Sequence, residues 1–189
     1  MLKIITGIAK GKRIETLEGE ATRPTSQRIK EALFSAIQFD VENRRVLDLF
    51  AGSGQLGLEA LSRGASSVTF VDMARESMDI VKKNARSVGF FERCRYVVSD
   101  YRNYVRKASD IDKYDLVFID PPYNMHCCAD AVARISEKGL LQDGAILAIE
   151  SGDEELSFDN LPCFEVIKST KYGKKTTLNI LIYREGEKE

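Results

Sequence analysis

A glycine-rich segment near residue 50 has the residue types and spacing of a loop that holds a nucleotide-like cofactor. Gly52, Gly54 and Gly57 form the pattern G-x-G-x-x-G. Glycine lets the backbone turn tightly and approach a ligand, and the helix expected to follow would offer N–H groups at its start. Asp72 follows about 20 residues later, where a carboxylate can accept hydrogen bonds from ribose hydroxyls. This pattern fits a nicotinamide dinucleotide as well as other adenosine-containing cofactors.

Asp48, which precedes the glycines, favours one of these cofactors. A carboxylate at this place would repel a pyrophosphate, but it can hold an ammonium group through charge-assisted hydrogen bonds. S-adenosylmethionine carries an ammonium and a sulfonium, so we expect it to be the cofactor. Asp100, at the end of the third core strand, can accept from an adenine amino group or cap the helix that follows, and both interpretations stay open. The expected cofactor site comprises Asp48, Phe50, Ala51, Gly52, Ser53, Gly54, Asp72 and Asp100.

The segment Asp120-Pro121-Pro122-Tyr123 could position an amine for methyl transfer. The lone pair of an exocyclic amine is delocalised into its ring, so two acceptors are needed to hold the hydrogens and turn the lone pair toward the methyl group. The Asp120 carboxylate and the Pro121 carbonyl can be these acceptors, and proline stiffens the loop. Tyr123 offers a face on which an extruded base can stack. We expect these four residues to catalyse an in-line transfer that needs no metal.

From residue 45 onward, the sequence repeats a unit of apolar strand, glycine turn and helix. Glycines that follow the expected helices can supply the left-handed residue of a helix end. Strands that are apolar on both faces and alternate with helices predict a parallel sheet covered on both sides. In such a sheet, ligands bind at the carboxyl ends of the strands, where both segments described above lie. We expect strands at 46–50, 67–71, 95–98, 115–119 and 145–149, and helices at 56–63, 75–88, 101–108 and 128–138.

Both ends of the chain depart from this repeat. Residues 164–169 and 177–183 flank a turn and predict an antiparallel hairpin that completes a mostly parallel, seven-stranded α/β sheet. At the other end, residues 3–8 and 13–17 predict a second hairpin. An amphipathic helix follows, with Thr25 or Ser26 expected as its N-cap. We expect a single domain over residues 1–189, with the hairpin and helix extension over 1–40 and the core over 41–189.

The composition excludes several classes of protein. The chain has 189 residues, of which 43% are hydrophobic and 30% charged. A chain of this length buries about 70% of the surface that its unfolded form exposes, so one domain can be stable without disulfides. No apolar run approaches the ~20 residues that span a bilayer. The four cysteines include no C-x-x-C pair, and His126 is the sole histidine, which argues against a zinc site. We expect a cytoplasmic protein without a metal or a membrane partner.

Several motifs together resemble those of bacterial 16S ribosomal RNA guanine-N2 methyltransferases of the RsmD type, over nearly the whole chain. The glycine loop with Asp-Pro-Pro-Tyr is typical of amine methyltransferases in general, whereas residues 23–28 and 56–65 narrow the resemblance to this family. The family often has Phe, Glu and Ala where this chain has Tyr123, Asp72 and Gln55. The matching segments are Arg23-Pro24-Thr25 with Arg28, residues 31–34, 47–54, 56–65 and 120–123, and Tyr172-Gly173.

The resemblance implies a class I Rossmann-like fold, S-adenosylmethionine as the methyl donor and a guanine of 16S rRNA as the target. The rRNA would be part of the small ribosomal subunit or of its assembly intermediate. Arg23, Thr25 and Arg28 resemble family positions near the catalytic cleft, with a role toward RNA phosphate or the cofactor carboxylate. Asn124 could also touch the substrate. Residues 1–30 hold seven basic and three acidic side chains, which suits RNA phosphates. We expect a monomer.

Other functions remain compatible with the residues. A methyltransferase acting on adenine or cytosine in DNA, on another RNA, or on a glutamine side chain in protein would use a related loop. A ribosome-assembly factor without catalysis would not need the intact glycines and carboxylates. An oxidoreductase that binds a nicotinamide dinucleotide would need an evident acid or base for hydride transfer, and His126 is the sole histidine. The roles of His126 and of the turn from Lys171 to Lys175 stay open.

Overall fold

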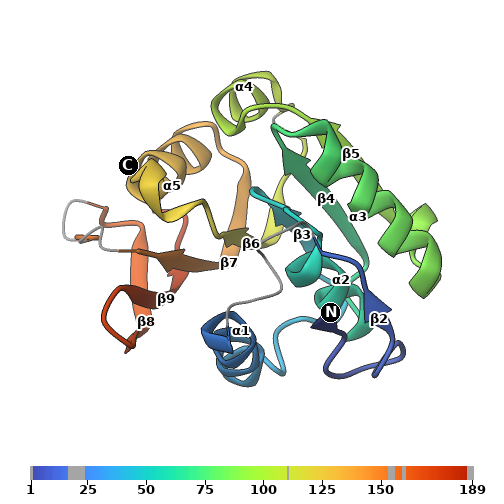
Figure 1. Cartoon of the computed structure of the whole chain (residues 1–189). Coiled ribbons are helices and arrows are strands. Elements are labelled where there is room, and N and C mark those ends of the chain that lie inside the picture. The colour runs from blue at the N-terminus through green and yellow to red at the C-terminus, as the bar shows by residue number, and fades with distance from the viewer. Residues whose placement is uncertain (1, 17–23, 110, 153–155, 159–160, 187–189) are drawn as a thin grey trace.

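A twisted sheet of seven strands forms the centre of the computed structural model (Figure 1). The structure describes residues 2–16, 24–109, 111–152, 156–158 and 161–186, and it describes only the backbone of residues 24–26 and 123. The strands are β3 (Arg45–Asp48), β4 (Ser67–Asp72), β5 (Cys94–Val98), β6 (Tyr114–Ile119), β7 (Leu141–Ser151), β8 (Phe164–Tyr172) and β9 (Thr176–Tyr183). Their order across the sheet is β5-β4-β3-β6-β7-β9-β8.

The first five strands of this order are parallel, whereas β9 runs antiparallel to both β7 and β8. This confirms the predicted seven-stranded sheet that ends in an antiparallel hairpin. After β3 the chain moves outward to β4 and β5, and it then returns to place β6 on the other side of β3. The crevice between the carboxyl ends of β3 and β6 is therefore the switch point where such sheets bind ligands.

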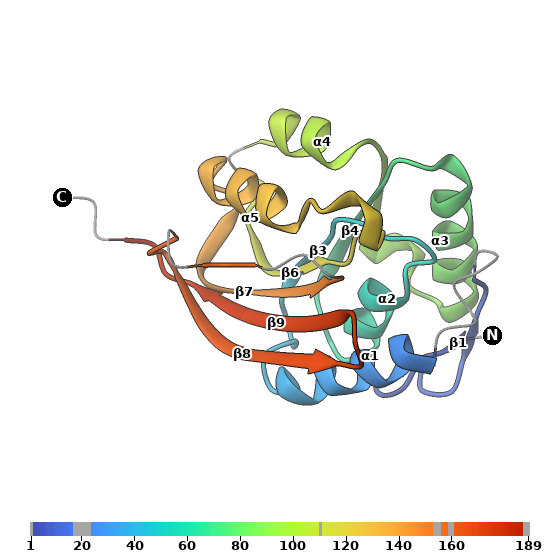
Figure 2. The same ribbon diagram turned by 60° about the vertical axis from the view of Figure 1, so that its left-hand side comes forward.

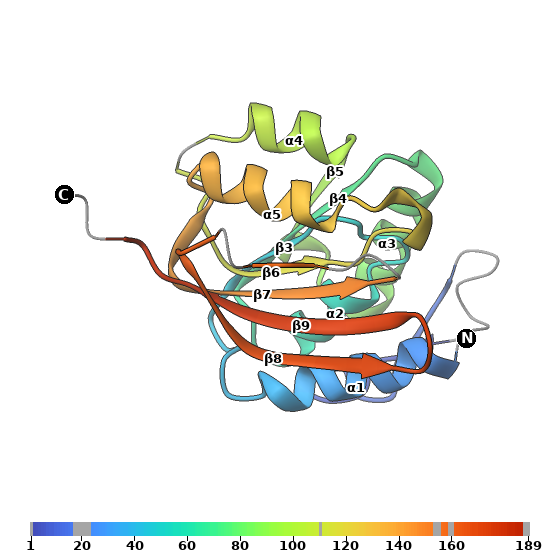
Figure 3. The same ribbon diagram turned by 90° about the vertical axis from the view of Figure 1, so that its left-hand side faces the viewer.

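Helices cover both faces of the sheet, as the two-sided apolar pattern predicts (Figures 2 and 3). Alternating strand residues enter two separate cores. Phe70, Phe118 and Ala148 pack on one side with the first three helices, whereas Val71, Ile119 and Ile149 pack on the other side with the last two. The helices are α1 (Pro24–Ala36), α2 (Gln55–Ser62) and α3 (Arg75–Val88) on the first face, and α4 (Tyr101–Lys107) and α5 (Cys128–Glu137) on the second.

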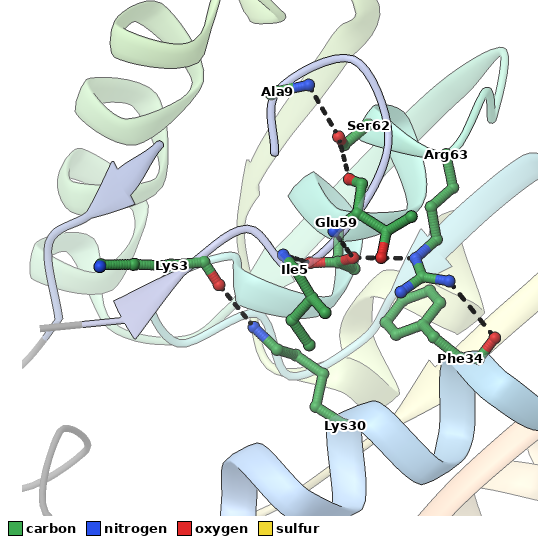
Figure 4. Close-up of polar contacts among 9 residues, drawn as sticks. Lys3, Ile5, Ala9, Lys30, Phe34, Glu59, Ser62 and Arg63 are labelled. Atoms are coloured by element: carbon green, nitrogen blue, oxygen red, sulfur yellow. Dashed lines mark hydrogen bonds and ion pairs between the residues drawn. The ribbon is translucent and has the colours of Figure 1, made fainter. Parts of the chain in front are cut away.

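The N-terminal hairpin is shorter than predicted. Only β1 (Leu2–Lys3) and β2 (Arg13–Ile14) pair as strands. Several of the residues between them bond to the C-terminal half of α2. The Ala9 N–H donates to Ser62 Oγ at 3.0 Å (Figure 4), and the Ile8 N–H donates to the Ser62 carbonyl at 2.9 Å. Gly7, at φ +84°, lies so close to Ser62 that a Cβ atom would be 1.8 Å from its carbonyl oxygen. Of the strand predicted over 3–8, Lys3 lies in β1 and Ile4 still bonds to Lys12 and Gly11 across the hairpin, whereas the chain from Ile5 onward is a loop held on a helix.

A buried ion pair fastens this loop. The fully buried carboxylate of Glu59 accepts from the Ile5 N–H at 2.7 Å and from the Thr6 N–H at 3.0 Å. It also accepts from Arg63 Nε at 2.8 Å, and the Arg63 guanidinium lies 4.6 Å from the centre of the Phe34 ring in α1 (Figure 4). Glu59 and Arg63 therefore join the N-terminal loop, α1 and α2 at one point.

The starting point of α1 corrects another prediction. The helix begins at Pro24, so Thr25 and Ser26 lie in its first turn, and neither is the N-cap. Proline is favoured at the first helical position, because its fixed φ suits a helix and the N–H that it lacks would have no partner within the helix. The N-cap position itself lies outside the described residues.

Within the described parts of the chain, no helix is both long and apolar enough to cross a membrane.

Candidate active site

The glycine loop joins β3 to α2, and backbone hydrogen bonds tie it to the neighbouring strands. The Leu49 N–H donates to the Phe118 carbonyl at 3.1 Å, and the Ala51 N–H donates to the Val71 carbonyl at 2.9 Å. Gly54, at φ +80°, is the N-cap of α2. A left-handed backbone at this position is costly for other residues, so glycine is required to turn the strand directly into the helix. The loop is thus held between β4 and β6, at the switch point.

Two carboxylates predicted to bind the cofactor hold the loop from either side. Asp72, at the end of β4, accepts from the Gly52 N–H at 2.9 Å through one oxygen and from the Ala74 N–H at 2.8 Å through the other. Asp48 is buried and accepts from the Gly57 N–H in the first turn of α2 at 3.0 Å. Each carboxylate oxygen has two acceptor sites, so these bonds leave Asp72 with capacity for ribose hydroxyls. The ligand-binding roles of both residues stay predictions.

The surroundings of Asp72 fit a cofactor that has a ribose and a flat apolar ring. Met73 follows Asp72 and is 68% exposed, and Val98, the partner of Asp72 in the β4–β5 ladder, is 46% exposed. Apolar side chains left open at the carboxyl ends of two adjacent strands offer surfaces on which a ring can rest. In the loop itself, the fully buried Ser53 Oγ has no hydrogen-bond partner among the described residues. A ligand that donates a hydrogen bond here would satisfy it.

The remaining predicted cofactor residues differ in what they contact. Asp100 is the N-cap of α4, because its Oδ1 accepts from the Arg102 N–H at 2.9 Å. This confirms the capping interpretation, while the contact with adenine stays a prediction. The Phe50 ring packs at a tilt against Tyr101, with 5.2 Å between the ring centres.

The Asp-Pro-Pro-Tyr loop leaves the carboxyl end of β6, next to the glycine loop. Asp120 directly follows Ile119, the last residue of β6, and is half-buried. Pro121 is buried, Pro122 is exposed, and a 3₁₀ turn over Tyr123–Met125 follows. The turn is closed by the Met125 N–H, which donates to the Pro122 carbonyl at 2.9 Å. The acceptor role of the Pro121 carbonyl and the stacking role of Tyr123 stay predictions.

A pocket opens beside Asp120, on the side of the sheet that α1 covers. Glu150 of β7 and Gln55 of α2 contribute polar groups to it, and neither residue was predicted as a site residue. The Gln55 Oε1 atom is buried and has no hydrogen-bond partner in the described part of the chain. The signal in the sequence that could have identified Glu150 is its charge, which stands at the end of the apolar run of β7. The full lining is Ile29, Lys30, Leu33, Gln55, Leu56, Asp120, Ala148, Glu150 and Leu178.

Lys30 brings a buried cation to the α1 wall of this pocket. The residue is 2% exposed, and its Nζ donates to the Lys3 carbonyl at 3.3 Å (Figure 4). Burial lowers the pKa of Lys30 below its ordinary value, although the charge of Glu59 opposes the change. A buried ammonium is stable only when it is hydrogen-bonded or paired, so the bond to Lys3 also helps to position the N-terminal segment.

The predicted substrate residues that the structure describes lie on two elements at the carboxyl edge of the sheet. Arg28 is exposed on α1, and Asn124 is exposed in the 3₁₀ turn that follows the prolines. The backbone of Thr25 lies in the first turn of α1, and Arg23 is outside the described residues. In Figures 2 and 3, the start of α1 lies beside the turn that joins β8 to β9, at the edge where β7 ends. Lys171, Lys174 and Lys175 are exposed around that turn.

The strand order, the glycine loop after β3 and the Asp-Pro-Pro-Tyr loop after β6 define a Rossmann-like methyltransferase fold. The solved structure of the Escherichia coli protein yhhF is similar, with a TM-score of 0.85 and 26% identity over 98% of this chain and 99% of that chain. In the described ranges, no group of three or more His, Cys, Asp or Glu side chains could hold a metal ion.

The chain belongs to the family described as conserved hypothetical protein 95, whose model matches residues 2–181. It is 31% identical over 151 residues to the ribosomal RNA small subunit methyltransferase D of Haemophilus influenzae, covering 79% of this chain and 78% of that protein. It is also 31% identical over 150 residues to the protein of the same name in Escherichia coli strain K12, covering 79% and 74%. These relatives confirm the resemblance to the RsmD-type family.

Proposed function

We propose that this protein methylates the exocyclic N2 amine of a guanine in 16S rRNA, with S-adenosylmethionine as the donor. The observation that carries the proposal is the position of Asp120. Its carboxylate follows β6 at the switch point of the sheet, adjoins the glycine loop and lines a pocket. An acceptor is needed there to hold an amine, and the two relatives named above are small-subunit rRNA methyltransferases.

The cofactor would occupy the glycine loop and the carboxyl ends of β4 and β5. Asp48 would face its ammonium group, Asp72 would accept from its ribose hydroxyls, and Met73 and Val98 would flank its adenine. When bound, S-adenosylmethionine supplies an electrophilic methyl group on a sulfur that leaves as a neutral thioether. The residues that favour this assignment are the acidic Asp48 before the glycines and the exposed apolar pair at the strand ends.

Asp120 orients the amine and helps it to lose a proton. Its carboxylate and the Pro121 carbonyl accept from the two N2 hydrogens, so the nitrogen lone pair points along the line to the methyl carbon. The new N–C bond forms as the S–C bond breaks, and the electron pair of the S–C bond stays on sulfur. One N2 proton then leaves through Asp120 to water. Tyr123 stacks on the extruded base, which offsets the few kcal/mol needed to unstack it.

The RNA would approach the carboxyl edge of the sheet. Arg28 on α1 and Asn124 after the prolines are exposed there, and Arg23 and Thr25 belong to the same proposed surface. The natural substrate would be 16S rRNA within the small ribosomal subunit or its assembly intermediate. The monomeric state and the cytoplasmic location are parts of the same proposal.

The test is the transfer of labelled methyl from S-adenosylmethionine to a panel of substrates. The panel contains small ribosomal subunits from a strain that lacks this gene, naked 16S rRNA, duplex DNA and total protein. We expect label in the rRNA of the subunits with the wild-type protein and with Asp79→Asn, an exposed control on α3. We expect loss of that label with Asp120→Ala. Label that enters only DNA or protein, or full transfer by Asp120→Ala, would contradict the proposal.

A further inference from the structure

The pocket beside Asp120 has a second carboxylate next to the first. Strands β6 and β7 are parallel neighbours, and Ile119 and Ile149 are partners in their ladder. Asp120 follows Ile119 directly after the end of β6, Glu150 follows Ile149 within β7, and adjacent strands are about 4.8 Å apart. Side chains alternate between the faces of a sheet, and Phe118 and Ala148 lie two residues before Asp120 and Glu150. Both carboxylates are therefore expected on the α1 side, where Phe118 and Ala148 pack. Both line the pocket.

The opposite neighbour of β7 supports this orientation of Glu150. Its antiparallel partner on β9 is Leu178, and directly opposed residues project on the same face. Leu178 is buried in the core beneath α1 and lines the same pocket. Leu33 of α1 adds another apolar wall. The pocket thus has apolar walls on these sides and Lys30 in its α1 wall, and Asp120 and Glu150 lie side by side within it.

Gln55 adds a third acceptor to this pocket. Its Oε1 is buried and lacks a hydrogen-bond partner among the described residues, although the side chain lines the pocket. A buried acceptor that lacks a partner costs free energy, which a ligand with a donor at this place would recover. Three acceptors from α2, β6 and β7 therefore favour a ligand whose edge carries several adjacent N–H groups.

Among amine substrates, guanine has such an edge. Its N2 amino group adjoins N1–H, so two neighbouring atoms both donate. In adenine the amino group adjoins the lone pair of N1, in cytosine it adjoins the lone pair of N3, and in a glutamine amide it adjoins the carbonyl oxygen. A second carboxylate opposite any of these lone pairs would leave two acceptors facing each other.

We propose that Glu150 is a specificity-determining residue that accepts a hydrogen bond from N1–H of the target guanine while Asp120 holds N2. This inference rests on the proposed function and deepens it. Glu150 selects guanine by two means, because its carboxylate bonds to the correct edge and repels the edge of the other bases. A flipped base is recognised in this way by hydrogen bonds to its Watson–Crick edge.

The experiment compares two bases that differ at the edge that Glu150 would contact. Wild-type protein first identifies the methylated guanine in small subunits. Subunits are then reconstituted with 16S rRNA that carries guanine or 2-aminopurine at this position. 2-Aminopurine keeps the amine but has a lone pair at N1. Since a hydrogen bond to a charged group contributes about 1.5–3 kcal/mol, we expect wild-type kcat/KM to favour guanine by about 10- to 150-fold.

Glu150→Gln should reduce this preference to less than a third of the wild-type value, because its amide can donate to the lone pair of 2-aminopurine. A residue with only a structural role would lower both rates equally and leave their ratio unchanged. The matched control is Glu165→Gln on the edge strand β8, where the carboxylate is 59% exposed and pairs with Arg184 at 3.5 Å. It should keep the wild-type ratio. Circular dichroism and cofactor binding check that each variant folds.

Two results would overturn the inference while leaving the proposed function intact. One is a wild-type protein that methylates guanine and 2-aminopurine at equal rates, which needs no variant. The other is a folded Glu150→Gln variant with an unchanged ratio. A wild-type protein that methylates no guanine in any rRNA would overturn the proposed function first and this inference with it. The three results are distinguishable because the wild-type reaction with guanine is measured before any substitution.

Discussion

Replacing Glu59 by glutamine should destabilise the whole N-terminal part of the molecule. The Glu59 carboxylate is fully buried and accepts three hydrogen bonds, two from backbone N–H groups of Ile5 and Thr6 and one from Arg63. The substitution keeps the shape, but it removes the charge and replaces one acceptor oxygen by an amide group that donates. The Arg63 side chain is 13% exposed, so water could solvate its unpaired guanidinium only in part after the ion pair is lost.

Removing one charge of a buried pair costs about 3–5 kcal/mol, and we expect the lower end because glutamine retains one acceptor. The free energy of unfolding should therefore fall by about 3 kcal/mol, which for a chain of this length lowers Tm by about 6–12 °C. Urea unfolding followed by circular dichroism measures the first quantity, and calorimetry measures the second. The control Glu165→Gln should change stability by less than about 0.5 kcal/mol. A loss below about 1 kcal/mol for Glu59→Gln would show that the buried Glu59–Arg63 pair contributes little to stability.

Three further predictions concern packing, pH and RNA binding. Gly57→Ala should cost about 1–3 kcal/mol in urea unfolding, because a Cβ atom would lie 2.3 Å from the Phe70 ring. The hydrogen bond from Arg134 lowers the pKa of Asp130 to about 2. The ionised Asp130 therefore contributes stability above its unfolded pKa, near 4, and this contribution is lost as pH falls through about 2. Asp130→Asn should make the loss of stability between pH 4 and pH 2 smaller, by at most about 1 kcal/mol. Lys174→Ala with Lys175→Ala should weaken rRNA binding and reduce its salt slope by about 2 in filter binding.

Each of these predictions has a result that contradicts it. A Gly57→Ala protein as stable as wild type would mean that Phe70 can move aside without cost. If the stability of Asp130→Asn fell as steeply as that of wild type between pH 4 and pH 2, other carboxylates would be responsible for the acid sensitivity. Equal salt slopes for wild type and the double lysine variant would show that Lys174 and Lys175 in the β8–β9 turn do not contact RNA phosphates. The control for the last test is Lys107→Ala with Lys113→Ala, a pair outside that turn.

The repeated strands and helices could be predicted because their physical causes are local. Apolar residues on both faces mark β4 and β6, and Gly89 ends α3 at the predicted residue with φ +86°. The glycine loop and the Asp120 loop could be located for the same reason, since each directly follows a recognisable strand. Their meeting at one crevice follows from the rule that parallel strands share a carboxyl edge.

The parts that sequence reasoning missed depend on contacts between distant segments. The residues after Ile4 include strand-forming types, but Glu59 and Ser62, more than 50 residues later, accept from the backbone N–H groups of Ile5, Thr6 and Ala9. Local patterns contain no information on this bonding. Glu150 is likewise a single charge at the end of an apolar strand. Its place beside Asp120 depends on the register of β6 with β7, which pairs Ile119 with Ile149.

Nucleoside analysis by mass spectrometry of 16S rRNA after the reaction tests the proposed methylation most directly. Small subunits from a strain that lacks this gene are incubated with S-adenosylmethionine and with wild type, Asp120→Asn or the exposed control Asp79→Asn. We expect N2-methylguanosine at one position with wild type and with the control, and a rate at least about tenfold lower with Asp120→Asn. A methyl group on another atom or base, or an undiminished rate with Asp120→Asn, would contradict the proposed function.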